Sequence, residues 1–150
     1  MKVYITYDRY ESNEYFNIYQ ITTRMSEVRK DYKKNLINFI SYGPDDCHNY
    51  QIQIVNLTKE EYKLLKSHVD NHTEDDDEFM ELMTKIYEDP DSDCLICTDG
   101  CSDNDELVNF WIEYNGLDDY DEDQIEEDLN NDGTFYDKVL KKYINYTYQI

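Results

Sequence analysis

Residues 50–56, Tyr-Gln-Ile-Gln-Ile-Val-Asn, carry the clearest strand pattern in this chain of 150 residues. Two isoleucines alternate with two glutamines, which places the isoleucines on one face of a strand and the glutamines on the other. Directly afterwards, Thr58-Lys59-Glu60-Glu61 forms a capping box, a pattern typical of a helix start. The chain therefore changes from strand to helix at this point.

Upstream of this change the sequence predicts mostly strands. Residues 2–8 and 15–21 alternate between apolar and polar side chains, and the polar link 9–14 suits a hairpin. Residues 26–34 carry four of the chain's 14 basic residues and predict a short surface helix. Residues 36–42 predict a further strand, which the following Gly-Pro turn ends.

Downstream of Thr58 the sequence predicts mostly helices, separated by acidic turns and by a loop over 89–104 that holds three cysteines. The predicted helices cover 58–69, 75–88, 104–114, 124–129 and 135–146, and residues 146–150 are expected to return as an edge strand. Strands first and helices afterwards predict an α+β fold. We expect an antiparallel sheet of three to five strands, mainly from the N-terminal half, packed with helices mainly from the C-terminal half, in a single domain 1–150.

The charge is concentrated in the second half of the chain. Between Glu74 and Asp132 there are 24 acidic residues and one base, Lys85, whereas residues 1–70 carry ten acids and ten bases. The net charge is −21 and the isoelectric point is near 4.2. Because such a surface repels phosphates and anionic lipids, we expect no direct nucleic-acid or membrane binding, and a basic protein surface as the partner.

The composition predicts an intracellular, cytoplasmic protein. The N-terminus lacks the apolar run of a signal peptide, and no stretch approaches the length of a membrane helix. The chain has no alanine but is rich in Asn, Ile, Lys and Tyr, whose codons are AT-rich. An AT-rich genome is inferred, with a phage or mobile element among the candidates.

The cysteines are the first candidate chemical site. Cys94, Cys97 and Cys101 give a C-x2-C-x3-C pattern, with Cys47 far upstream as a candidate fourth ligand. Paired cysteines on a tight loop supply part of the tetrahedral set that zinc requires. No second C-x2-C pair is present, so free thiols of an intracellular protein remain the alternative.

Residues 128–134 resemble the first half of an EF-hand calcium loop. Asp128, Asn130 and Asp132 occupy positions one, three and five, and Gly133 follows at the turn. Position twelve, which requires a bidentate carboxylate, is Val139. The pattern therefore favours an ordinary turn, and calcium is not expected as a cofactor.

An enzyme is not expected. The three histidines accompany no nucleophile motif, and a chain with four glycines contains no phosphate-binding Gly-rich loop.

The acidic half has two interpretations: a solvated face that keeps the protein soluble, or an imitation of the nucleic-acid backbone. In acidic composition, over roughly residues 74–132, the chain resembles the DNA-mimic inhibitors of phages and mobile elements, which block restriction or CRISPR nucleases. That resemblance implies a non-catalytic inhibitor of a basic nucleic-acid-binding protein; the alternative function is a zinc-stabilised interaction module. The candidate partner-binding residues are Glu74, Asp75, Asp76, Asp77, Glu78, Asp89, Asp91, Asp93, Asp103, Asp105, Glu106, Asp118, Asp119, Asp121, Glu122, Asp123, Glu126, Glu127 and Asp128.

Overall fold

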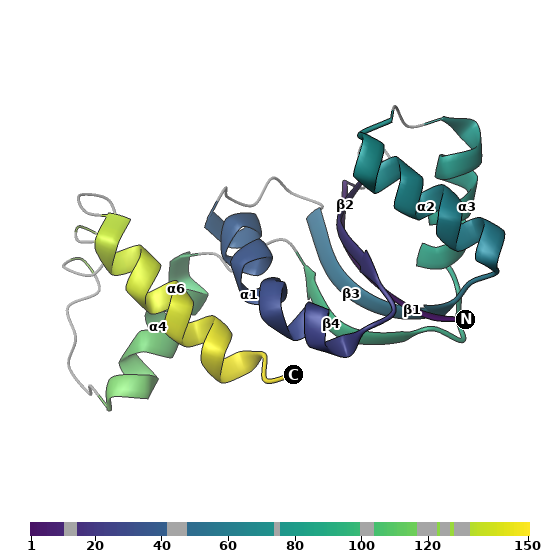
Figure 1. The fold of residues 1–150 in the computed structure, drawn as a ribbon. Coiled ribbons are helices and arrows are strands. Elements are labelled where there is room, and N and C mark those ends of the chain that lie inside the picture. The colour runs from purple at the N-terminus through teal and green to yellow at the C-terminus, as the bar shows by residue number, and fades with distance from the viewer. Residues whose placement is uncertain are drawn as a thin grey trace.

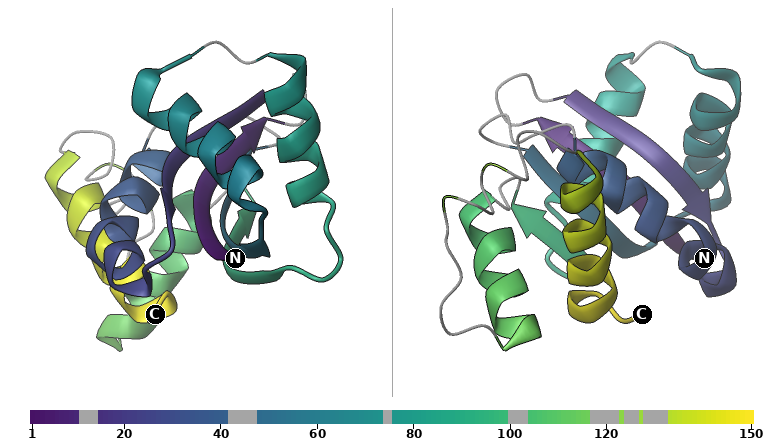
Figure 2. Two further views of the ribbon diagram at one scale, coloured as in Figure 1. Left: turned by 45° about the vertical axis from the view of Figure 1, so that its right-hand side comes forward. Right: turned by 90° about the vertical axis from the view of Figure 1, so that its left-hand side faces the viewer.

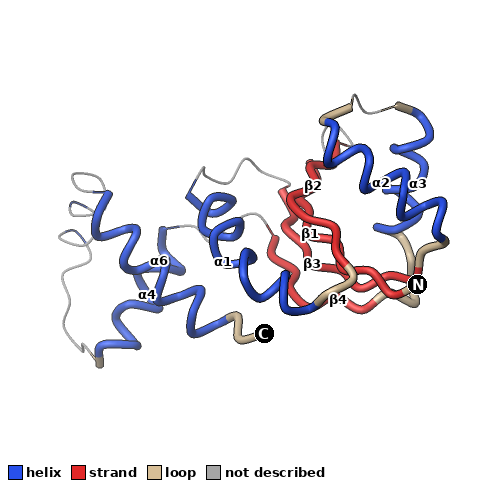
Figure 3. The backbone as a smooth tube through the Cα atoms, in the orientation of Figure 1, coloured by secondary structure: helices blue, strands red, loops and turns tan. Residues whose placement is uncertain are grey.

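The computed structural model describes residues 1–10, 15–41, 48–73, 76–99, 104–116, 123, 127 and 133–150. Its strands and helices are shown in Figure 1 and, coloured by type, in Figure 3. In chain order they are β1 (Lys2–Tyr10), β2 (Tyr15–Thr22), α1 (Met25–Ser41), β3 (His48–Asn56), α2 (Lys59–Asn71), α3 (Asp77–Tyr87), β4 (Asp93–Asp99), α4 (Asn104–Asn115) and α6 (Gly133–Thr147).

The described strands form one antiparallel sheet in the order β2-β1-β3-β4. Strand β1 pairs with β2 as the predicted hairpin and with β3 on its other side. Strand β3, the stretch with the clearest strand pattern, lies between β1 and β4. The predicted α+β fold with an antiparallel sheet is confirmed, with three strands from the first half of the chain and β4 from the second.

Helices cover both faces of this sheet, so the architecture has three layers. Helices α2 and α3 lie on one side, and α1, α4 and α6 lie on the other (Figures 1 and 2). The alternation along β1 explains the two cores, since Val3, Ile5 and Tyr7 pack towards α2 and α3 while Tyr4 packs towards α1 and α6. Two of the described helices come from the first half of the chain and three from the second.

The predicted start of α2 is confirmed in detail. The Thr58 hydroxyl accepts a hydrogen bond from the Glu61 amide at 3.1 Å, and the Glu61 carboxylate accepts one from the Thr58 amide at 3.1 Å. Tyr62, Leu65 and Val69 recur at helical spacing, which predicts an apolar stripe. All three pack in or against the core, and Leu65 is fully buried.

The prediction of a short helix followed by a strand over 36–42 was wrong. Helix α1 continues without a break from Met25 to Ser41. Val28, Tyr32, Leu36, Phe39 and Ile40 are all buried in one core. Their spacing of three or four residues is that of one helical face, which a local reading of the apolar run 36–40 as a strand overlooked.

The prediction that residues 89–104 form a loop was also wrong, because Asp93–Asp99 is strand β4. Ile96 is buried opposite Ile52 of β3. The hydrogen bonds that define this strand come from β3, about forty residues earlier, and local sequence contains no sign of them.

Two predictions near the C-terminus fail as well. Residues 146 and 147 belong to α6 and residues 148–150 are not a strand, so the expected edge strand is absent from the described residues. Helical spacing also predicts that Leu107, Trp111 and Tyr114 share a core-facing side of α4, but Tyr114 is 52% exposed. Helix α4 does end at Asn115 as predicted, with Gly116 at a φ of 63°. The predicted helix 124–129 lies outside the described residues, apart from Glu127.

Among the described helices, none combines the length and the apolar character required to cross a membrane.

Candidate functional site: an acidic surface on helix α3

Helix α3 begins with three consecutive carboxylates that its backbone holds in place. The Asp76 side chain caps the helix by accepting a hydrogen bond from the Phe79 amide at 2.8 Å. Asp77 and Glu78 occupy the first turn, where the partial positive charge of the helix N-terminus stabilises them. The acids predicted to bind a partner here are therefore part of a well-formed helix start.

The opposite face of α3 packs into the core. Phe79, Met83 and Ile86 are buried at spacings of four and three residues. The Phe79 ring also stacks on the imidazole of His68 from α2, with ring centroids 3.7 Å apart. Because these three apolar side chains face inward, Asp77, Glu81 and Glu88 face outward.

A glutamine of the sheet anchors the C-terminal end of α3. Gln53 Nε2 donates hydrogen bonds to the Ile86 carbonyl oxygen at 2.7 Å and to Ser92 Oγ at 2.5 Å. Gln53 is itself 3% exposed. The helix is therefore attached to the sheet by buried polar contacts as well as by apolar packing.

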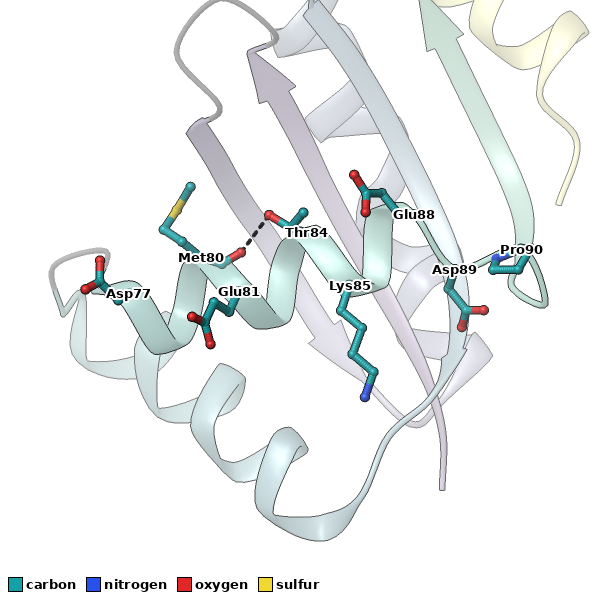
Figure 4. A pocket seen from close by; sticks show the side chains of 8 residues that line it. All are labelled: Asp77, Met80, Glu81, Thr84, Lys85, Glu88, Asp89 and Pro90. Carbon is teal, nitrogen blue, oxygen red and sulfur yellow. Dashed lines mark hydrogen bonds between the residues drawn. The ribbon is translucent and has the colours of Figure 1, made fainter.

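A shallow concavity of about 800 Å³ runs along the outer side of α3 and into the turn that follows (Figure 4). Most of its lining residues recur every three or four positions, the spacing of one helical face. They are Asp77, Met80, Glu81, Thr84, Lys85, Glu88, Asp89 and Pro90. Thr84 donates to the Met80 carbonyl oxygen at 2.8 Å, so its hydroxyl is used within the helix.

A second hollow, of about 310 Å³, lies between α2 and α3 and is lined by Glu60, Glu61, Leu64, Glu78, Glu81, Leu82 and Lys85. Together the two hollows define what we call the α3 acidic surface. Its seven carboxylates belong to Glu60, Glu61, Asp77, Glu78, Glu81, Glu88 and Asp89, and its one base is Lys85.

The α3 acidic surface is largely uncompensated. The ion pairs between described residues are Arg24–Glu27, Lys66–Asp70 and Lys85–Glu61, and only the last, at 3.6 Å, involves this surface. Burial by itself raises the pKa of Glu61, but hydrogen bonds from Thr58 and the Lys85 ammonium outweigh it, and the pKa lies below its usual value. Seven carboxylates and one ammonium leave a local charge of −6.

The structure brings part of the predicted partner-binding set together. Asp76, Asp77 and Glu78 lie at the start of α3. Asp89 and Asp91 lie in the turn that follows this helix, and Asp93 begins β4. Asp105 and Glu106 lie on α4, on the other side of the sheet. Asp123 and Glu127 are exposed. Glu74, Asp75, Asp103, Asp118, Asp119, Asp121, Glu122, Glu126 and Asp128 lie outside the described residues.

Four acids of the α3 acidic surface were not among the residues selected from sequence. Glu81 and Glu88 share the outer face of α3 with Asp77, four and eleven residues away, so helical spacing contained the signal for them. Glu60 and Glu61 reach the surface from α2. Only the packing of α2 against α3 brings these two close, and no local pattern predicts it.

Of the proposed zinc ligands, Cys94 and Cys97 are free, exposed thiols on β4, and Cys47 and Cys101 lie outside the described residues. Among the residues that the structure describes, no group of three or more His, Cys, Asp or Glu side chains is arranged to hold a metal ion. The prediction that Cys94 and Cys97 lie on a tight loop was wrong, because both lie on strand β4.

The segment that resembles a calcium loop lies outside the described residues up to Asp132. Val139, at the position where calcium would need a carboxylate, is 1% exposed in the core beside α1.

Comparison with known proteins finds no matching family model, no matching curated protein and no matching solved structure.

Proposed function

We propose that this protein is a non-catalytic inhibitor that binds a basic nucleic-acid-binding protein, using the α3 acidic surface in place of a nucleic-acid backbone. The observation that supports the proposal is the local charge of −6, carried by seven carboxylates from two packed helices.

The charge density along α3 is comparable to that of a nucleic-acid strand. The five carboxylates between Asp76 and Glu88 extend over twelve residue steps, or about 18 Å of helix axis. One strand of DNA places about five phosphates along the same length. A groove that binds consecutive phosphates would therefore meet a similar number of negative charges.

The rigidity of α3 also supports the proposal. Exposed ion pairs contribute only about 0–1 kcal/mol each, so an acidic ligand binds tightly only if its charges act together. The Asp76 cap, the buried face at Phe79, Met83 and Ile86, and the anchor from Gln53 hold the acids in one arrangement. Binding therefore costs less conformational entropy than the binding of a disordered acidic tail, which would have to become ordered.

The resemblance in composition to DNA-mimic inhibitors extends the proposal to one class of partner. A nuclease that a host uses against foreign DNA has the basic groove that the α3 acidic surface would fill. An AT-rich genome, with a phage among the candidate sources, is compatible with an anti-restriction or anti-CRISPR role acting in the host cytoplasm.

The proposal is tested first by capture and displacement. The immobilised protein is exposed to a bacterial lysate, and captured proteins are eluted with duplex DNA, with RNA or with salt. We expect a basic protein that nucleic acid displaces. That protein, once purified, should lose nucleic-acid binding when the acidic protein is added.

A matched pair of variants then locates the interface. The triple variant Asp77→Asn, Glu81→Gln, Glu88→Gln removes three charges from the concavity on α3. The control Asp31→Asn, Glu113→Gln, Asp137→Asn removes three exposed charges from α1, α4 and α6, across the sheet. We expect the first to weaken binding about 10-fold to 100-fold at low salt and the second to have little effect. Equal effects of the two variants would indicate that the acidic charge only keeps the protein soluble. Simultaneous binding of nucleic acid and this protein to the captured partner would contradict mimicry.

A further inference from the structure

An irregularity in strand β4 determines where its two cysteines point. Cys94 and Cys97 are three residues apart, a spacing that puts side chains on opposite faces of a regular strand. Here Cys97 pairs with Gln51 and Ile96 with Ile52, but the next pair is Cys94 with Gln53. Leu95 is therefore an additional residue, and this bulge returns both cysteines to the same face.

The hydrogen bonds of Tyr7 identify that face. The Tyr7 hydroxyl lies 2.6 Å from Gln53 Oε1 and 3.1 Å from Gln51 Oε1, so both glutamines are on its side of the sheet. Residues directly opposite each other in an antiparallel pair share a face, which places Cys94 and Cys97 there too.

The two thiols are neighbours. Cys97 is close enough to the Cys94 thiol to raise its pKa, and the Cys94 Sγ donates to the Ile96 carbonyl oxygen at 2.9 Å. Both cysteines are exposed, and β4 is an edge strand. The exposed carboxylates of Asp91 and Asp93 precede them directly in the chain, so the local field favours the approach of a cation.

A metal ion held between two sulfurs spans a wider gap than a disulfide bond does. Side chains that are neighbours on one face of a strand start about 6.7 Å apart, at the upper limit of Cα separations for a disulfide. A zinc–thiolate bond, for example, is about 2.3 Å long, so a metal ion between two thiolates separates the sulfurs by up to about 4.6 Å.

The number of ligands indicates the kind of ion. Zinc in structural sites takes four ligands, and the described residues around β4 supply two. Thiolates select soft ions, and monovalent copper is stable between as few as two of them.

We propose that Cys94 and Cys97 form a two-thiolate site for a soft monovalent metal ion, of the class of Cu(I). Binding replaces two S–H bonds by two Cu–S bonds, releases two protons and transfers no electron. Because thiols bind a metal ion in the deprotonated form, the apparent affinity should rise as the pH rises from 6 to 8.

The test is competition for Cu(I) against a chromophoric chelator, under reducing conditions, with the full chain. The variant Cys47→Ser, Cys101→Ser removes the other two thiols, and we expect it to bind one Cu(I) with wild-type affinity and the stated pH dependence. Cys94→Ser and Cys97→Ser should each bind at least 100-fold more weakly. Wild-type affinity in Cys97→Ser, or lost binding in the variant at 47 and 101, would overturn the proposal.

A second measurement needs no substitution. Wild-type protein is alkylated with iodoacetamide with and without one equivalent of Cu(I), and the modified cysteines are identified by mass spectrometry. Protection of Cys94 and Cys97 alone is the expected result. Protection of Cys47 or Cys101 instead would assign the ion to a different site and overturn the proposal.

Discussion

The hydroxyl of Tyr7 donates a hydrogen bond of 2.6 Å to Oε1 of Gln53 across the β1–β3 pair, with both residues buried. The same glutamine uses its amide nitrogen to hold the Ile86 carbonyl oxygen and Ser92. A single polar side chain thus connects the sheet to the end of α3. Because α3 carries the acidic surface, this relationship positions the candidate site as well as stabilising the core.

The first prediction concerns this connection. Gln53→Leu removes the 2.6 Å partner of the Tyr7 hydroxyl, which keeps only Gln51 Oε1 at 3.1 Å, and removes the side-chain donor to the Ile86 carbonyl oxygen. It should lower the free energy of unfolding by about 1–3 kcal/mol. Gln51→Leu, at a half-buried side chain on the same strand, is the control and should cost less than about 1 kcal/mol. Urea denaturation measures both. Equal losses would mean that Gln53 is not the anchor.

A second prediction concerns alkaline pH. Burial raises the pKa values of Tyr7 and Tyr50 well above the usual tyrosine value, and raises the pKa of Cys94 to about 11. Above pH about 9 the unfolded chain therefore releases protons that the folded protein retains. The contribution of these groups to the free energy of unfolding should be constant below pH about 8 and should fall progressively as the pH rises above 9.

Denaturant titrations at pH 8, 9, 10 and 10.5 measure this fall. Tyr50→Phe should make the fall in stability with pH shallower. It should change stability little at pH 8, because the Tyr50 hydroxyl donates only a long hydrogen bond of 3.4 Å to the Tyr32 carbonyl oxygen. Tyr146→Phe, at a ring that is 65% exposed, is the control and should leave the pH dependence as it is. An unchanged slope in Tyr50→Phe would contradict the prediction.

A third prediction tests the start of α2. Thr58→Ala removes the hydroxyl that caps the Glu61 amide, and should lower the free energy of unfolding by about 1 kcal/mol. Thr84→Ala removes an exposed threonine in the interior of α3 and should be neutral or slightly stabilising, since alanine is the better helix former. Thermal or urea unfolding distinguishes the two. A neutral Thr58→Ala would show that the cap contributes little.

A fourth prediction tests the continuous helix α1. Leu36→Ala creates a cavity beside Tyr50 and Ile52 in the core, and should cost about 2–5 kcal/mol. Asn38→Ala, at an exposed position two residues later, should stabilise a helix by a few tenths of a kcal/mol. A destabilising Asn38→Ala would favour the strand that local sequence suggests for this segment, because alanine is disfavoured in strands.

A fifth prediction concerns salt. The carboxylates of the α3 acidic surface repel one another at short range, with one ammonium among them. Raising sodium chloride from about 20 to 300 mM shortens the screening length and should raise the melting temperature. The triple variant at Asp77, Glu81 and Glu88 should respond less than the wild type. The same response in both would place the repulsion elsewhere in the chain.

By itself the sequence determined the local elements whose signals are short in range. The alternation in residues 50–56, the capping box at Thr58 and the helical pattern of residues 75–88 depend on neighbours within a few residues, so the elements β3, α2 and α3 were correctly predicted. The α+β class followed from their order, and the concentration of acids in the second half followed from counting.

Tertiary structure decided what these elements face. The glutamine face of β3 was predicted from its alternation, but only the packing of α2 and α3 makes it a buried face on which Gln53 anchors a helix. Likewise, only pairing with β3 turns Asp93–Asp99 into a strand, and only its bulge aligns Cys94 with Cys97. These features depend on contacts between residues far apart in the chain, whose free energy is gained only once the layers assemble.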